Sequence, residues 1–135
     1  MNAERPVGQT RSQGWEIGVR RTVPMSAGRA WGAIMAALGL DWAYDPESPP
    51  FERGRPFITD DGTRGEIRSF EQGSLLRMKW QPPGWEVNTT LQIRVLPAKK
   101  GSTISIHHEW LKDGEMREAM RARWTALLEA IEKKE

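Results

Sequence analysis

The segment RRTVPMSAGRAWGAIMAALGLDW, Arg20–Trp42, joins the end of a strand to an amphipathic helix. It is preceded by WEIGV, and over residues 15–23 apolar and polar residues alternate with the period of a half-buried strand. Pro24 cannot donate to a strand ladder, and Ser26 can cap the N-terminus of a helix. The residues that follow place one apolar stripe on a helix from about Ala27 to Leu38: Ala27, Ala30, Trp31, Ile34 and Leu38.

Downstream of a proline-rich stretch, the sequence predicts strands joined by short turns. The predicted strands are RGEIRSF (64–70), SLLRMKW (74–80), VNTTLQIRV (87–95) and STISIHHEW (102–110), and DDGT at 60–63 is typical of a hairpin turn. Alternation places Leu76, Met78 and Trp80 on one face, and Ile104, Ile106, His108 and Trp110 on the inward face of the last strand. This order predicts an antiparallel meander.

The chain closes with a long amphipathic helix, expected from about Asp113 to Lys134. Its apolar residues recur at helical spacing: Met116, Met120, Trp124, Leu127, Leu128 and Ile131. Roughly 20 residues give a rod of about 30 Å, which must bury its stripe on the apolar face of the sheet.

Several of these segments together resemble the START-like, or SRPBCC, superfamily, in the branch named after the activator of the heat-shock protein 90 ATPase. The opening RTVPMSAGRAW, at residues 21–31, is similar to the start of that branch, although Ser26 stands where relatives usually have proline. Trp42 matches a tryptophan that follows the first helix. The remaining motifs are RGEI (64–67), LLRMKW (75–80), GSTISIHH (101–108) and WTALLEAI (124–131), so the likeness covers about residues 15–133.

The resemblance implies an α+β helix-grip fold. In this fold a curved antiparallel sheet wraps around the long C-terminal helix, and two short helices follow the first strand. We expect residues 1–13 to be a flexible tail and residues 14–135 to form a single domain. The resemblance also implies a deep cavity between sheet and helix that holds apolar ligands, and some relatives are cyclases or hydrolases.

Composition argues against several other classes of protein. The chain has no cysteine and only two histidines, which are adjacent in sequence, so neither a thiolate nor a His-rich metal site is expected. The net charge of +2 is spread along the sequence, which argues against a nucleic-acid partner. No apolar run approaches the roughly 20 residues of a membrane span, and the polar N-terminus lacks a secretory signal, so we expect a cytoplasmic location and no cofactor.

The aromatic residues point to the candidate site. Six tryptophans lie on or beside predicted apolar faces: Trp15, Trp31, Trp42, Trp80, Trp110 and Trp124. Packing in the core explains most of them. Each indole N–H needs a partner, however, and so small a core is difficult to fill completely with six indole rings. Strand alternation directs His108 inward, whereas His107 and Glu109 point outward. The predicted ligand-binding residues are Trp31, Met78, Trp80, His108, Met120 and Trp124.

The sequence favours a small-molecule binding protein over an enzyme. The ligand would be apolar or aromatic, with His108 either a hydrogen-bonded core residue or an anchor for a polar group. Two alternatives stay open: a chaperone-interacting module, as the branch's name suggests, and a cyclase or hydrolase that uses His108 as a general base. The sequence also leaves open a homodimer, and a lid formed by the loop Asp45–Pro56.

Overall fold

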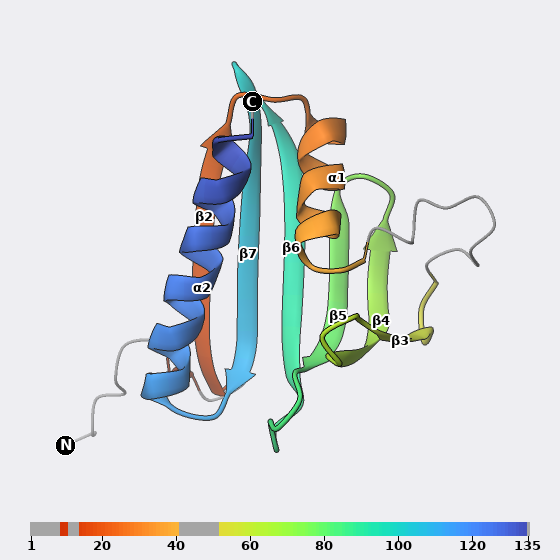
Figure 1. The fold of residues 1–135 in the computed structure, drawn as a ribbon, viewed down its shortest axis with the longest axis vertical. Coiled ribbons are helices and arrows are strands. Elements are labelled where there is room, and N and C mark those ends of the chain that lie inside the picture. Colours follow the sequence, from red (N-terminus) through yellow and green to blue (C-terminus); the bar gives the residue numbers. More distant parts are fainter. Residues whose placement is uncertain (1–8, 11–13, 41–51, 135) are drawn as a thin grey trace.

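The computed structural model describes residues 9–10, 14–40 and 52–134 as one antiparallel sheet with two helices on the same face (Figure 1). The helices are α1 (Ala27–Ala37) and α2 (Gly114–Glu132). The strands are β1 (Gln9–Thr10), β2 (Gly14–Val23), β3 (Pro56–Ile58), β4 (Arg64–Glu71), β5 (Leu75–Gln81), β6 (Thr89–Ala98) and β7 (Gly101–Leu111). The predicted helix-grip fold and its long terminal helix are therefore confirmed.

The strand order is β1-β2-β7-β6-β5-β4-β3. Strands β3 to β7 form the expected meander, and β7 then pairs with β2, so the first long strand and the last lie side by side. Helix α2 packs mainly over β2, whereas α1 lies over β6 and β7 (Figure 1). The two helices thus cover neighbouring parts of one sheet face.

The core lies between this face and the helices. One cross-strand row runs through Ile17, His108, Leu91, Met78 and Ile67, on five adjacent strands. All five side chains are buried, because each occupies an inward position of the alternating pattern. Helix α2 adds its own stripe to this row: Met120, Trp124, Leu128 and Ile131.

Both helices begin at the residues that the sequence predicted. The Ser26 hydroxyl accepts a hydrogen bond from the Arg29 N–H at 3.2 Å, and the Asp113 carboxylate accepts one from the Met116 N–H at 2.8 Å. These side chains satisfy amide groups that the first turn of a helix leaves unpaired. The buried face of α1 consists of Ala30, Trp31, Ile34 and Met35, and Leu38 caps its C-terminus.

The prediction that Trp110 points inward is wrong. Its φ of 66° is the only positive value at a non-glycine residue in the described chain, and its side chain is 45% exposed. Between the pairs Ile17–His108 and Trp15–Leu111, β7 contributes one more residue than β2. This bulge interrupts the alternation, so that Leu111 takes the buried position instead.

Glu109 points away from His108 as predicted, but it is not exposed. Its side chain is 2% exposed, and one carboxylate oxygen accepts a hydrogen bond from Arg77 at 2.7 Å. His107 lies beside it and contacts Glu16 at 2.9 Å. The outer face of the sheet therefore holds a compact polar network rather than isolated surface charges.

Some sequence predictions fall on residues outside the described part of the chain. These are the position of Trp42, most of the loop Asp45–Pro56 and most of the predicted tail. Within residues 1–13 the structure describes Gln9–Thr10, which pair with Gly14 and Trp15 of β2. One helix, α1, follows β2 in the described residues, where the resemblance implied two.

Candidate ligand-binding site

A hydrogen-bonded chain joins helix α2 to strand β5 through the middle of the core. The Trp124 indole N–H donates to Nδ1 of His108 at 3.1 Å, and Nε2 of His108 lies 2.8 Å from the Thr89 hydroxyl. That hydroxyl in turn donates to the backbone carbonyl of Trp80 at 2.6 Å. Three of the six predicted site residues, Trp80, His108 and Trp124, are thereby brought together.

This chain fixes the protonation of His108. An indole N–H can only donate, so Nδ1 must be the unprotonated nitrogen and Nε2 must carry the hydrogen. Burial lowers the pKa of His108 from 6.5 to about 3, with smaller contributions from the charges of Arg123 and His107. His108 is therefore neutral at physiological pH, and both of its ring nitrogens already have protein partners.

Aromatic rings surround His108. The Trp80 ring meets it edge-on at a centroid distance of 5.2 Å, and the Trp124 ring lies tilted at 5.8 Å. The Trp85 ring stacks on it at 6.2 Å with an interplanar angle of 10°. Trp80 also contacts both of the other indoles, at 5.8 Å and 5.4 Å. We call Trp80, Trp85, His108 and Trp124 the aromatic cluster.

The other three predicted residues lie at different distances from this cluster. Met78 is fully buried on β5, one inward position from Trp80 and two strands from His108 in the same cross-strand row. Met120 is buried one turn before Trp124 on α2. Trp31 instead packs against Phe70, with ring centroids 6.3 Å apart, and no ring contact between Trp31 and the cluster is found among the described residues.

Two hollows flank the aromatic cluster. The first, the Arg123 hollow, has a volume of about 190 Å³ and lies between the end of α1, residues 59–63, Trp80 and Arg123. The second, the Trp85 hollow, has a volume of about 330 Å³ and is bounded by Trp85 and by residues at the start of α2, among them Met116 and Met120. At the interface between α2 and the sheet, Trp124 and Leu128 are buried.

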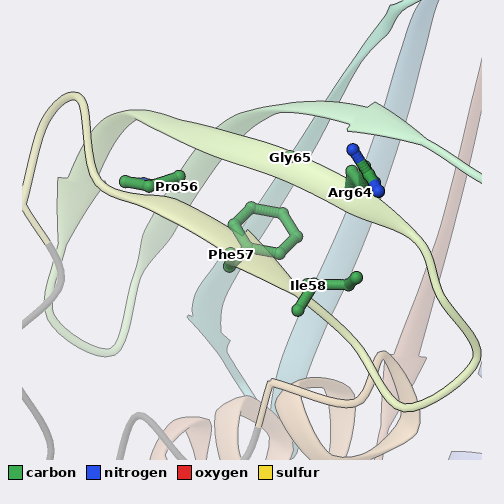
Figure 2. A pocket seen from close by; sticks show the side chains of 5 residues that line it. All are labelled: Pro56, Phe57, Ile58, Arg64 and Gly65. Atoms are coloured by element: carbon green, nitrogen blue, oxygen red, sulfur yellow. The ribbon is translucent and has the colours of Figure 1, made fainter.

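A wider hollow, of about 440 Å³, lies at the far edge of the sheet (Figure 2). Its walls are Pro56, Phe57 and Ile58 of β3 with Arg64 and Gly65 of β4, and the Phe57 ring projects between the two strands. It contains none of the predicted site residues. A specific small-molecule site usually has several converging polar groups, and this hollow offers only the Arg64 side chain.

Sequence reasoning missed three contributors to the site. Trp85 lies in the turn between β5 and β6, where no periodicity marks a buried face. Arg123 sits on α2 among other charged residues, and only its position next to Trp124 sets it apart. The period-2 pattern of residues 87–95 puts Thr89 on the same face as Leu91 and Ile93, but its hydrogen bond to His108 depends on a strand register that the sequence does not show.

No group of three or more His, Asp or Glu side chains among the described residues is arranged to hold a metal ion. Neither α1 nor α2 is long and apolar enough to cross a bilayer.

Comparison with known proteins gave matches in structure only. No family model and no curated protein sequence matches the chain. CalU16 from Micromonospora echinospora superposes with a TM-score of 0.68 at 16% identity, over 88% of this chain and 74% of that one. PFC0360w, an HSP90 activator from Plasmodium falciparum, superposes with a TM-score of 0.69 at 15% identity, over 88% of this chain and 94% of that one.

A third similar structure is DynU16, a protein of the dynemicin biosynthetic locus. Its TM-score is 0.69 at 16% identity, and the match covers 87% of this chain but 46% of DynU16. At such identities the likeness concerns the fold. These matches show that the chain has the helix-grip fold.

Proposed function

We propose that the protein binds a small apolar or aromatic molecule between the sheet and helix α2, at the aromatic cluster. The observation that carries this proposal is the position of Trp85. Its ring covers one face of the buried His108 in a nearly parallel stack, although it comes from a turn and is only half-buried. A planar ligand stacked on His108 would take the same place.

The walls of the site suit such a ligand. Trp80, Trp124 and His108 supply flat faces and edges, and Met78 and Met120 supply adaptable side chains close by. Stacked and edge-to-face aromatic pairs are each worth about 0.5–1.5 kcal/mol beyond their buried area. Trp31, which packs against Phe70, would contribute to the ligand pocket only through the packing of α1.

Binding is favoured over catalysis because of His108. A general base needs a pKa near the working pH and a nitrogen directed at the substrate. The pKa of His108 is held at about 3 by burial, and its unprotonated Nδ1 already accepts from Trp124. The cyclase or hydrolase alternative would require this hydrogen bond to break. For the chaperone alternative, the likeness to an HSP90 activator concerns the fold alone.

The proposal can be tested with 2-naphthamide, a flat and uncharged aromatic probe. We expect it to shift the indole N–H signals of Trp85 and Trp124 in a ¹H–¹⁵N NMR titration and to leave Trp110, on the exposed bulge, unchanged. Trp85→Ala should tighten binding severalfold by uncovering His108, whereas the matched variant Trp110→Ala should not. If 2-naphthamide and a wider panel of apolar and aromatic molecules shift no cluster signal, the proposed function is wrong.

A further inference from the structure

Arg123 occupies an unusual position beside the aromatic cluster. Its guanidinium carbon lies 5.0 Å from the centroid of Trp80 and 4.9 Å from that of Trp124. Guanidinium groups are attracted to indole faces, and such contacts hold the planar fork in one orientation. Arg123 remains open to solvent on its other side and forms a wall of the Arg123 hollow.

The charge of Arg123 has no close counter-ion in the part of the chain that the structure describes. Several other arginines pair with glutamates at 2.6–3.0 Å: Arg21, Arg68, Arg77, Arg117 and Arg121. No carboxylate among the described residues lies within 4.0 Å of a nitrogen of Arg123, and no hydrogen bond of its side chain is found there. Its five N–H donors are therefore available to a bound molecule.

Two acidic residues, Asp60 and Asp61, line the Arg123 hollow together with Arg123. Burial lowers the pKa of Arg123, and the negative charge of Asp61 offsets part of this effect. Asp61 is held in place because one carboxylate oxygen accepts hydrogen bonds from the Thr59 hydroxyl and the Thr63 N–H. Arg123 and Asp61 thus both line a space of about 190 Å³.

We propose that Arg123 binds the carboxylate of an aromatic or apolar carboxylic acid whose ring system lies against Trp80. This inference rests on the proposed function and adds the charge of the ligand to it. A guanidinium presents two parallel N–H donors to a carboxylate. Contact with the Trp80 and Trp124 rings orients these donors of Arg123 before a ligand binds. Trp80 and Arg123 both line the Arg123 hollow, so a ring that lies there against Trp80 has its carboxylate beside the arginine.

The experiment compares 2-naphthoate with 2-naphthamide by calorimetric titration at neutral pH. The two molecules have nearly the same size and shape and differ in charge. We expect 2-naphthoate to bind about tenfold more tightly, as one charge-assisted bidentate contact would give. Arg123→Gln should abolish this preference, so that the two Kd values become equal within about twofold, and Arg123→Lys should restore part of it.

Asp61, which lines the same hollow, provides a second and independent variant. Asn at position 61 keeps an oxygen that accepts from Thr59 and Thr63 but removes the negative charge. We therefore expect Asp61→Asn to tighten 2-naphthoate binding severalfold relative to 2-naphthamide binding. This variant should fold normally, and circular dichroism checks that each variant does.

The outcomes separate the two proposals. If the protein binds neither molecule at the aromatic cluster, the proposed function fails. If 2-naphthamide binds equally tightly or more tightly, or if Arg123→Gln leaves the preference for 2-naphthoate intact, the role of Arg123 is wrong and the binding function stands. A preference that disappears in Arg123→Gln and increases in Asp61→Asn supports the carboxylate ligand.

Discussion

Among the single residues of the site, His108 shows how burial determines the protonation state of a side chain. Its side chain is fully buried, and each ring nitrogen meets a partner of the matching kind. A proton added to Nδ1 would remove the acceptor of the Trp124 indole and place a charge in a low-dielectric core. Burial is the largest cause of the low pKa of His108, and the charges of Arg123 and His107 contribute less.

This depressed pKa predicts that the fold loses stability in mild acid. The unfolded chain binds a proton at His108 with a pKa near 6.5, whereas the folded protein binds it at about 3. Below pH 6.5 the unfolded state therefore holds more protons, and stability falls as the pH is lowered. From pH 7 to pH 5 the contribution of His108 should cost about 2 kcal/mol of unfolding free energy, measured by urea denaturation.

The control for this prediction replaces each histidine in turn. His108→Gln lacks the titrating ring, so its stability should change less between pH 7 and pH 5 than that of the unaltered protein. His107→Gln, on the outer face of the sheet, should retain the pH dependence that His108 causes. Equal slopes for His108→Gln and the unaltered protein would contradict the assignment.

Between neighbouring elements, Gly65 shows how closely two strands and an aromatic ring approach. It lies on β4 opposite Trp80 of β5, with the Phe57 ring of β3 directly over it. A Cβ at this position would lie 2.2 Å from the Lys79 carbonyl oxygen and 2.2 Å from the Phe57 ring. The backbone carbonyl cannot move aside alone, so the junction of the three strands depends on the missing side chain.

We expect Gly65→Ala to destabilise the protein by about 1–3 kcal/mol, as overpacking does. The matched control is Gly28→Ala on α1, where an added Cβ meets no atom within 4 Å. Alanine favours a helix over glycine, so that variant should gain about 0.5–1 kcal/mol. Thermal denaturation of both variants tests the pair, and a neutral Gly65→Ala would show that the strand junction can relax.

At the level of the whole molecule, protection is expected to decrease from the centre of the sheet to its ends. Strand β7 pairs with β2 on one side and β6 on the other, and both helices lie against it. Strand β3 has a single neighbour and three residues. Amides that open only on global unfolding exchange slowly, and those of weakly packed segments exchange quickly.

Hydrogen exchange followed by NMR should therefore rank the strands. The amides of Ile104 and Ile106 are expected among the slowest, and those of Phe57 and Ile58 among the fastest within the strands. Exchange at Ile58 as slow as at Ile106 would mean that β3 is held by more than its pairing with β4.

Much of this architecture could be predicted because short-range patterns determine it. The alternation of β7 as far as His108, the Ser26 cap and the stripe of α2 are all local features, and each one is confirmed. The bulge at Trp110 could not be predicted, since it depends on pairing with β2 rather than on the sequence of β7.

The site was predictable only in part, for a similar reason. Trp80 and His108 occupy inward positions of alternating strands, and Trp124 belongs to the apolar stripe of a helix, so the sequence pattern predicts all three. Trp85 and Arg123 come from a turn and from a charged helix face, and their contacts with Trp80 arise from tertiary packing. The burial of Glu109 likewise depends on Arg77, which is 32 residues away in sequence.

The strand lengths at the two ends of the sheet have a consequence for self-association. The sheet finishes with two residues of β1 at one end and three residues of β3 at the other, whereas β2, β6 and β7 have ten or eleven. Long unpaired strands invite another copy of a protein to extend the sheet, and short terminal strands offer few backbone groups for this. In the described residues, however, β1 pairs only with Gly14 and Trp15, so most of β2 has no strand partner on that side, and this is the edge at which another copy could add a strand.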